Sequence, residues 1–183
     1  GMGLTAPHPS AYNAPKHHIG EITTYGTDGM RYVYGIPLYN TYQKEVTFAV
    51  GAKLYGGSGR TGNCTTGQVT YQTNSGEEDN SVNNKLGIDN YYNAEIIPPY
   101  AHSYLLTSVL SPDYIDADQV KGPSSGDLGY YTQFYYHPQT NYKWRTPVGN
   151  MQANWNEGLK CDPNDDKASY IYGEKELWYM DSI

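Results

Sequence analysis

Short segments in which apolar residues alternate with smaller or polar ones recur along the chain, and they predict β-strands. In the segment 42–50, Val46, Phe48 and Val50 occupy every second position. A period of two places successive side chains on opposite faces of a strand, so this segment has one buried face. Similar patterns predict strands at 21–25, 31–36, 44–50, 68–73, 100–110, 128–136, 142–146, 170–172 and 174–183.

Turn-forming residues separate these segments. The first two are joined by Gly-Thr-Asp-Gly at 26–29, whose Asp-Gly pair supplies the positive φ that tight hairpin turns require. The segment 100–110 also has leucines at helical spacing after two prolines, but its residues resemble those of the C-terminal segment, and we favour a strand. We therefore expect an all-β fold, a mainly antiparallel sheet built from hairpins, open or sandwich-like. It has long polar loops and at most one short helix near 99–110.

The chain of 183 residues has the length of one domain. Residues 1–18 contain three prolines and little apolar pattern, which predicts an extended N-terminal arm before a single β domain over 19–183. The segment 149–168 is polar and has no regular apolar pattern, so we expect it to be irregular. No turn closes the last segment, and this suggests a fragment of a longer polypeptide with an unpaired edge strand at 174–183.

Composition refines this expectation. The 21 tyrosines greatly outnumber the 2 phenylalanines and 3 tryptophans, and a ring with a polar tip suits thin, half-buried sheets. The net charge of −7 opposes binding to nucleic acid or to an anionic membrane, because the phosphates would be repelled. No apolar run approaches the length of a membrane span. We expect neither a nucleic-acid partner nor membrane insertion.

Three segments resemble the RHS/YD-repeat, SpvB-like class of large bacterial cell-surface proteins. Residues 29–35, GMRYVYG, are similar to a strand of that class. The segment 103–109, SYLLTSV, is followed by an Asp- and Gly-containing loop and then by 131–136, YTQFYY, in the order of one such repeat. The segment 176–183, ELWYMDSI, resembles the start of another. The resemblance implies a secreted or surface-anchored protein whose sheet coils with neighbouring sheets into a shell.

Two acidic loops are candidates for calcium sites, because Ca²⁺ takes six to eight oxygen ligands and alternating carboxylates can supply them. The alternative is an ordinary turn, in which Asp and Asn side chains bond to their own backbone. The first loop offers Asp113, Asp116, Asp118 and Asp127, and the second offers Asp162, Asn164 and Asp166. Calcium is the only cofactor that the sequence suggests.

Exposed aromatic rings are candidates for carbohydrate binding, since sugars present C–H faces that stack on such rings. Trp144, Trp155 and Tyr92 are the candidates, although packing in the core explains the same residues. Cys64 and Cys161 lack the spacing of a zinc or redox motif. They are either unpaired or, in an exported protein, joined in a disulfide bond.

No nucleophile, phosphate-binding loop or zinc-protease motif is present, so we expect no enzyme. The first hypothesis is a non-catalytic scaffold segment of a large exported bacterial surface protein, whose partner is the rest of its own polypeptide. The alternative is a carbohydrate-binding module that uses exposed aromatics to bind a polysaccharide. An enzyme with paired carboxylates is the weakest hypothesis, because carboxylates in turns are common.

Overall fold

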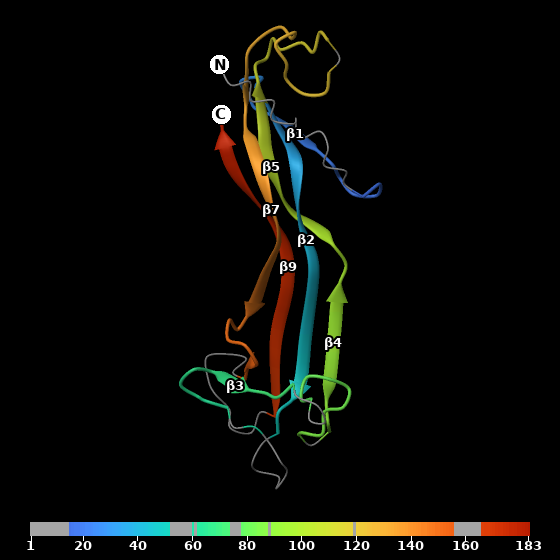
Figure 1. Ribbon diagram of the computed structural model, residues 1–183. Coiled ribbons are helices and arrows are strands. Elements are labelled where there is room, and N and C mark those ends of the chain that lie inside the picture. The colour runs from blue at the N-terminus through green and yellow to red at the C-terminus, as the bar shows by residue number, and fades with distance from the viewer. Residues whose placement is uncertain are drawn as a thin grey trace. The chain divides into compact units, whose positions relative to one another are not determined.

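The structure is a computed structural model that describes residues 15–51, 60, 62–73, 78–87, 89–118, 120–155 and 166–183. Within these residues the chain forms nine β-strands and no helix, in an open antiparallel sheet (Figure 1). The strands are β1 (Ile22–Tyr25), β2 (Arg31–Ala49), β3 (Gln68–Thr70), β4 (Tyr92–Ile97), β5 (Tyr100–Leu110), β6 (Tyr131–Gln133), β7 (Tyr135–Thr146), β8 (Gln152–Asn154) and β9 (Lys167–Ser182). The predicted all-β fold class is confirmed.

The chain divides into two compact units. The first unit comprises residues 1–40, 99–142 and 175–183, and the second comprises 41–98 and 143–174. The strands β2, β7 and β9 contribute residues to both. The expectation of one domain over 19–183 stays a prediction, because folding as a single cooperative unit is a thermodynamic property.

Most of the predicted N-terminal arm, residues 1–14, lies outside the described residues. Its last residues form a turn in which the His18 backbone N–H donates to the carbonyl oxygen of Pro15 at 2.8 Å. The His18 ring stacks on Tyr39 in the first unit, with the ring centroids 5.5 Å apart. The arm is therefore attached to the sheet where it enters β1.

In the first unit, β2 pairs with β1 through the predicted hairpin. The Gly26 N–H donates to the carbonyl oxygen of Met30 at 2.8 Å, and Gly29 has a φ of +82°. A side chain rarely adopts that conformation, which is why a glycine ends the turn. β5 pairs with the same residues of β2, and it begins and ends where the sequence predicts, at Tyr100 and Leu110.

The prediction of separate strands at 31–36 and 44–50 is wrong, because β2 is one strand of 19 residues. Residues 36–40 in its middle are all buried, so the alternation that reveals a strand is lost there. Pro37 does not interrupt it. The pairing with β5 instead continues through register shifts, one of them between Leu38 and Tyr39.

In the second unit, apolar side chains from four strands form a core. Phe48 is fully buried on β2, and its ring contacts Tyr71 and Tyr170 at centroid distances of 5.2 Å and 6.2 Å. Other members come from β3, β8 and β9 and their flanks: Val46, Val50, Val69, Ala153, Trp155 and Ala168. The face predicted from the period of two in 42–50 is confirmed.

Arg145 on β7 lies over two stacked tyrosine rings of this core. The rings of Tyr71 and Tyr170 are 5.6 Å apart and nearly parallel, and the guanidinium lies 4.3 Å from the Tyr170 centroid. Arg145 also donates to the Tyr71 hydroxyl at 2.7 Å and to the carbonyl oxygen of Gln152 at 2.7 Å. The tyrosines therefore do what phenylalanine cannot, since each ring packs in the core while its hydroxyl or its face binds a polar group.

The C-terminal part of the sequence differs most from expectation. The strands predicted at 170–172 and 174–183 are one strand, β9, which continues through Gly173. A Cβ atom at Gly173 would lie 2.5 Å from the indole of Trp144, so this glycine admits an aromatic ring rather than a turn. β9 pairs with β2, β7 and β8, and the prediction of an unpaired edge strand at 174–183 is therefore wrong.

Two short strands were not predicted. β4 pairs with β2 along its whole length, with Val46 opposite Ala94. β8 lies in the segment 149–168 that we expected to be irregular, and it pairs with β3. β8 has no β-branched or aromatic residue, so pairing with its neighbours rather than intrinsic propensity stabilises it. β4 does contain Tyr92, Ile96 and Ile97, a strand signal that the sequence analysis overlooked.

Candidate functional site

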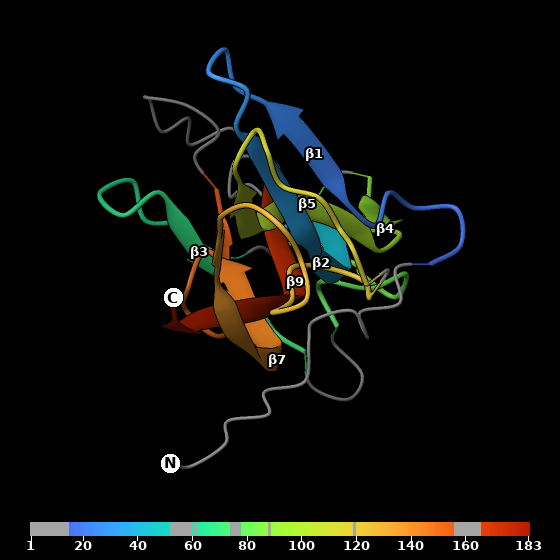
Figure 2. The same ribbon diagram turned by 90° about the horizontal axis from the view of Figure 1, so that it is seen from above.

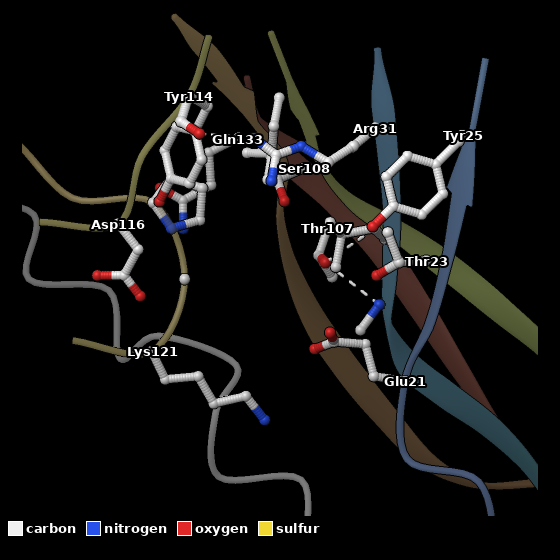
Figure 3. A pocket seen from close by; sticks show the side chains of 15 residues that line it. Glu21, Thr23, Tyr25, Arg31, Thr107, Ser108, Tyr114, Asp116, Lys121 and Gln133 are labelled. Atoms are coloured by element: carbon white, nitrogen blue, oxygen red, sulfur yellow. Dashed lines mark hydrogen bonds between the residues drawn. The ribbon is translucent and has the colours of Figure 1, made fainter. Parts of the chain in front are cut away.

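A pocket of about 320 Å³ lies in the first unit, on the face formed by β1, β2 and β5 (Figure 3). It is lined by side chains of the sheet and of the loop 111–130, of which Gln119 is not described. The lining residues are Glu21, Thr23, Tyr25, Arg31, Val33, Gly35, Thr107, Ser108, Leu110, Tyr114, Asp116, Lys121, Gly122, Pro123 and Gln133.

The register of four strands brings the sheet residues of the pocket together. Residues directly opposite each other in an antiparallel pair lie on the same face. In one such row, Val33 lies opposite both Thr23 and Ser108, and Ser108 lies opposite Gln133. A neighbouring row contains Tyr25, Arg31, Leu110 and Tyr131.

An irregularity in the pairing of β2 with β5 turns Thr107 toward the same face. The Thr107 hydroxyl donates to the carbonyl oxygen of Val33 at 3.1 Å and accepts from the Gly35 N–H at 3.2 Å. A Cβ atom at Gly35 would lie 2.8 Å from that hydroxyl oxygen, so the position requires glycine. Thr107 thus takes the place of a backbone partner that the register shift removes.

The loop 111–130 forms the other side of the pocket and is attached to the sheet through Arg31. The Nη2 atom of Arg31 donates to the carbonyl oxygen of Tyr114 at 2.7 Å and to that of Ser111 at 3.4 Å. The guanidinium also lies 5.4 Å from the centroid of the Tyr114 ring. Within the loop, Ile115 and Leu128 form an isolated β-bridge. The loop therefore has a defined conformation over the pocket.

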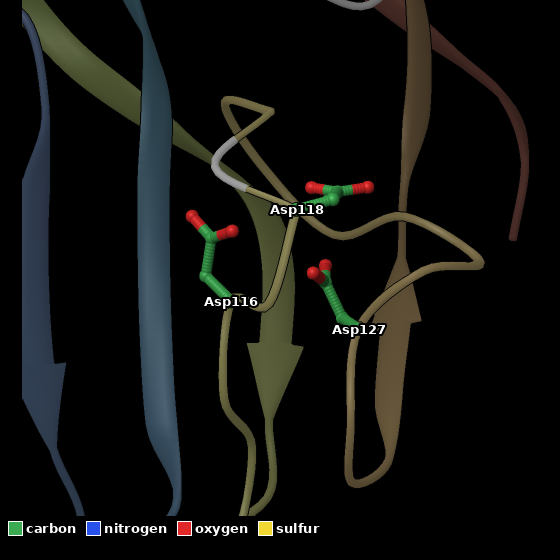
Figure 4. A group of neighbouring side chains, drawn as sticks. All are labelled: Asp116, Asp118 and Asp127. Atoms are coloured by element: carbon green, nitrogen blue, oxygen red, sulfur yellow. The ribbon is translucent and has the colours of Figure 1, made fainter.

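Three of the four aspartates predicted for the first calcium site come together in this loop (Figure 4). One carboxylate oxygen each of Asp116, Asp118 and Asp127 lies within 4.8 Å of the others. Asp113 is not part of the group, because its carboxylate accepts from the Ser111 hydroxyl at 2.5 Å. The sequence analysis therefore placed these three aspartates together, as the structure does, but it also included Asp113, which is not a member of the group.

Hydrogen bonds within the loop already occupy Asp127. Its Oδ2 atom accepts from the Tyr114 hydroxyl at 2.6 Å and from the Ser124 N–H at 2.8 Å, and its Oδ1 atom accepts from the Ala117 N–H at 3.1 Å. A calcium ion would compete with these three donors for the same oxygens. The geometry favours the alternative, an aspartate turn that holds the loop, and calcium binding stays a prediction.

The hydrogen bond from Tyr114 holds the pKa of the Asp127 carboxyl below its ordinary value of 3.8, and backbone donors add to this effect. Burial and the same bond raise the pKa of the Tyr114 hydroxyl. A lowered pKa in the folded state means that the stabilising bonds are fully present above the ordinary pKa and are lost as the pH falls through the lower folded value.

We therefore expect the Asp127 carboxyl to titrate below pH 3.8 in the folded chain, measured by the NMR shift of its carboxyl carbon. Replacing Tyr114 by phenylalanine removes the donor and moves this midpoint upward. Tyr131→Phe is the matched control, because Tyr131 contacts the Tyr114 ring without donating to Asp127. A midpoint that stays the same in Tyr114→Phe contradicts the assignment of the hydrogen bond.

The other predicted acidic site is not described, except for one residue. Asp162 and Asn164 lie outside the described residues. The Asp166 carboxylate accepts from the Lys167 ammonium at 3.1 Å, and its backbone carbonyl accepts from the Val50 N–H at 2.7 Å. Asp166 therefore pairs with a neighbouring lysine at the start of β9.

The aromatic residues predicted to bind carbohydrate do not form an exposed plane. Trp155 is 8% exposed and belongs to the core of the second unit, and Tyr92 packs against that core. Trp144 lies over Gly173. The core explanation, which the sequence also offered, accounts for Trp155 and Tyr92, whereas Trp144 is not a member of that core. Carbohydrate binding stays a prediction.

Sequence reasoning missed the pocket. The hairpin at 26–29 could have shown that Glu21, Thr23, Tyr25 and Arg31 share a face, because the register of a short hairpin follows from its turn. The other side of the pocket had no such signal, since no pattern in 111–130 shows where that loop packs.

Cys64 is disulfide-bonded, and Cys161, its expected partner, lies outside the described residues. In the described part of the chain, no helix has the length and apolar character that spanning a membrane requires. No family model, no curated protein and no solved structure matches this chain.

Proposed function

We propose that the chain is a non-catalytic scaffold segment of a large exported bacterial surface protein, and that its sheet pairs with further strands of the same polypeptide. The observation that carries the proposal is the open sheet, whose strand β4 pairs with β2 alone among the described strands. An edge strand has a row of N–H and C=O groups that point away from its neighbour and can pair with another strand.

β4 lacks the features that usually protect an edge strand. Four of its six residues are exposed, and Ile96 is 60% exposed. Its only charged residue is Glu95, whereas soluble proteins commonly block free edges with lysines, prolines or bulges. An exposed strand of this composition is suited to pair with an additional strand.

Two further observations support the proposal. The RHS/YD-like segments lie on strands, since 29–35 is largely in β2 and 103–109 is within β5. Shell-forming sheets of that class are scaffold, and their partner is the rest of their own polypeptide. The disulfide bond of Cys64 is the second observation, because such bonds persist in secreted and cell-surface proteins.

The test is Ile96→Lys, compared with Val82→Lys. Both side chains are exposed, but Val82 lies in a loop. In the isolated chain we expect Val82→Lys to change the free energy of unfolding by less than about 0.5 kcal/mol, and Ile96→Lys to cost up to about 1 kcal/mol because the new ammonium lies directly opposite Lys44. In the longer polypeptide, Ile96→Lys should cost more than in the isolated chain, because it removes an apolar contact with the added strand on the same face of the sheet, whereas Val82→Lys should cost the same in both. An Ile96→Lys cost that is equal in the two proteins would contradict the proposal.

The alternative hypothesis, a carbohydrate-binding module, was based on exposed rings of Trp144, Trp155 and Tyr92, and the surroundings of these rings do not favour it. Trp155 and Tyr92 pack in or against the core, and Trp144 covers a glycine. A carbohydrate would have to bind elsewhere, and the pocket of the first unit offers a different set of groups.

A further inference from the structure

The geometry points to a sugar-acid site in the pocket of the first unit, for a hydroxylated ring with one carboxylate, as in a uronate residue of a polysaccharide. This inference does not depend on the scaffold proposal, because every lining residue of the pocket lies in the first unit and β4 lies in the second. Four features of the pocket carry it: an arginine fixed by the loop, a hydroxyl that faces the pocket, a second cation, and acceptors with an exposed ring on the β1 side.

Arg31 is suited to hold the carboxylate. Its Nη2 atom is fixed by two backbone carbonyls of the loop, whereas its Nε and Nη1 atoms make no hydrogen bond to the described residues. No carboxylate forms an ion pair with it in the described part of the chain. Both parallel N–H pairs of a guanidinium include Nη2, so with Nη2 held by the loop the Nε or Nη1 atom can donate one charge-assisted hydrogen bond to a carboxylate, and a fixed guanidinium loses little freedom on binding.

Ser108 provides a second group on the same face. The residue is 2% exposed and lines the pocket, yet its hydroxyl makes no hydrogen bond to a described residue. It lies opposite Val33, two positions along β2 from Arg31. Its hydroxyl is open to the pocket rather than sealed from solvent, so it can donate to a ligand oxygen there.

Lys121 adds a second positive charge on the loop side of the pocket (Figure 3). Its ammonium forms no ion pair with the described residues. Arg31 and Lys121 therefore give the pocket two cations without ion-pair partners, although the whole chain is acidic. The lining also contains the carboxylates of Glu21 and Asp116, so its formal net charge is zero, and the two cations favour an anionic group only where that group lies next to them.

The β1 side of the pocket suits the hydroxyls and the ring of a sugar. The carboxylate of Glu21 and the hydroxyl of Thr23 can accept from sugar hydroxyls, and neither has a hydrogen-bond partner among the described residues. Tyr25 is 75% exposed, so its ring is available for the C–H face of a sugar. A volume of about 320 Å³ is at the small end for ligand pockets and fits one sugar ring.

The experiment is an NMR titration of the isolated chain with glucuronate, galacturonate and mannuronate. Methyl glucoside, which lacks the carboxylate, and alanine, a zwitterion without hydroxyls, are the comparators. We expect at least one uronate to shift the amide resonances of Thr23, Arg31 and Ser108. Methyl glucoside and alanine should bind at least about tenfold more weakly, because each leaves part of the polar lining unpaired.

Variants of exposed residues then test the charges without disturbing the loop. Lys121→Gln should weaken uronate binding about threefold, as expected for one exposed charge. Glu21→Gln should weaken the binding of the uronates and of methyl glucoside by a similar factor of about threefold, because it removes a charged acceptor of sugar hydroxyls and leaves the carboxylate contact in place. Lys85→Gln, an exposed lysine of the second unit, is the matched control and should have no effect.

Three results would overturn the inference. The first is no binding of any of the three uronates at about 10 mM, where even weak sites are occupied. The second is equal binding of methyl glucoside, which would remove the role of the carboxylate. The third is a loss of affinity in Glu21→Gln but not in Lys121→Gln, which would indicate a cationic ligand. None of these results bears on pairing at β4.

Discussion

Replacing Phe48 by alanine is expected to lower the free energy of unfolding by about 4 kcal/mol. Phe48 is 0% exposed and contacts both rings of the stacked Tyr71–Tyr170 pair in the core of the second unit. The substitution removes the buried ring and leaves a cavity, and two large neighbouring tyrosines cannot easily fill that cavity. Urea denaturation followed by tryptophan fluorescence measures the change, since Trp155 belongs to the same core.

Tyr130→Ala is the matched control, because Tyr130 is 80% exposed and its ring contributes little to a core. We expect it to change the free energy of unfolding by less than about 0.5 kcal/mol. Phe48→Leu should fall between the two variants, since leucine retains most of the buried area. If Phe48→Ala cost no more than Tyr130→Ala, the core described for the second unit would be wrong.

Replacing Asp79 by alanine is expected to cost about 3 kcal/mol of folding free energy. Asp79 is 3% exposed, and its carboxylate accepts from Arg60 Nε at 2.9 Å and from Arg60 Nη2 at 3.3 Å. It also accepts from the Gln72 N–H at 2.8 Å. The variant removes the acceptor that Asp79 provides to a largely buried guanidinium and to a backbone N–H, and this penalty exceeds what the ion pair itself contributes.

The control is Asp89→Ala, which removes a carboxylate of the same type from the surface. The side chain of Asp89 is 50% exposed, and its contact with Lys167 is 3.5 Å long. An exposed pair of this kind contributes at most about 1 kcal/mol. The loss of folding free energy in Asp79→Ala should be similar at low and high salt, because salt screens buried pairs only weakly. The small loss in Asp89→Ala should disappear at high salt. Equal costs for the two variants would show that Asp79 is not buried in solution.

The sequence predicts the fold class because periodicity and turn chemistry are local signals. The hairpin at 26–29 was predicted correctly because an Asp-Gly turn needs no information from elsewhere. The strand at 100–110 was also predicted correctly, although its leucines have helical spacing, because its residues resemble those of the C-terminal segment. The lengths of β2 and β9 were not predicted. Both contain residues that usually end strands, Pro37 and Gly173, and only contacts with other parts of the chain reveal why the strands continue there.

In the candidate site, too, the sequence predicts what lies within one segment and does not predict contacts between distant segments. Asp116, Asp118 and Asp127 were expected to lie together because they share one loop, and they do. The sequence could not show that Tyr114 and two backbone N–H groups occupy Asp127. Nor could it show that this loop packs beside Arg31, because the contacts join segments about 80 residues apart that no turn relates.

Residue type alone also fails to separate core aromatics from binding aromatics. Trp155 is suited to either role by chemistry, and its location in the core depends on the pairing of β8 with β3 and β9. Neither β8 nor its pairing was predicted. The sequence offered both roles for Trp155, and the strand that it missed is the one that places this residue in the core.

Hydrogen exchange of β4 tests the central claim, that this sheet is a scaffold completed by further strands, most directly. Exchange should be followed by mass spectrometry on peptides covering 92–97 in the isolated chain and in the longer polypeptide, with the β2 residues 43–48 as the reference that is paired in both. The account predicts that the β4 peptide exchanges at least about tenfold more slowly in the longer polypeptide, because a new neighbour protects its outward N–H groups. Equal exchange of the β4 peptide in the two proteins would contradict it.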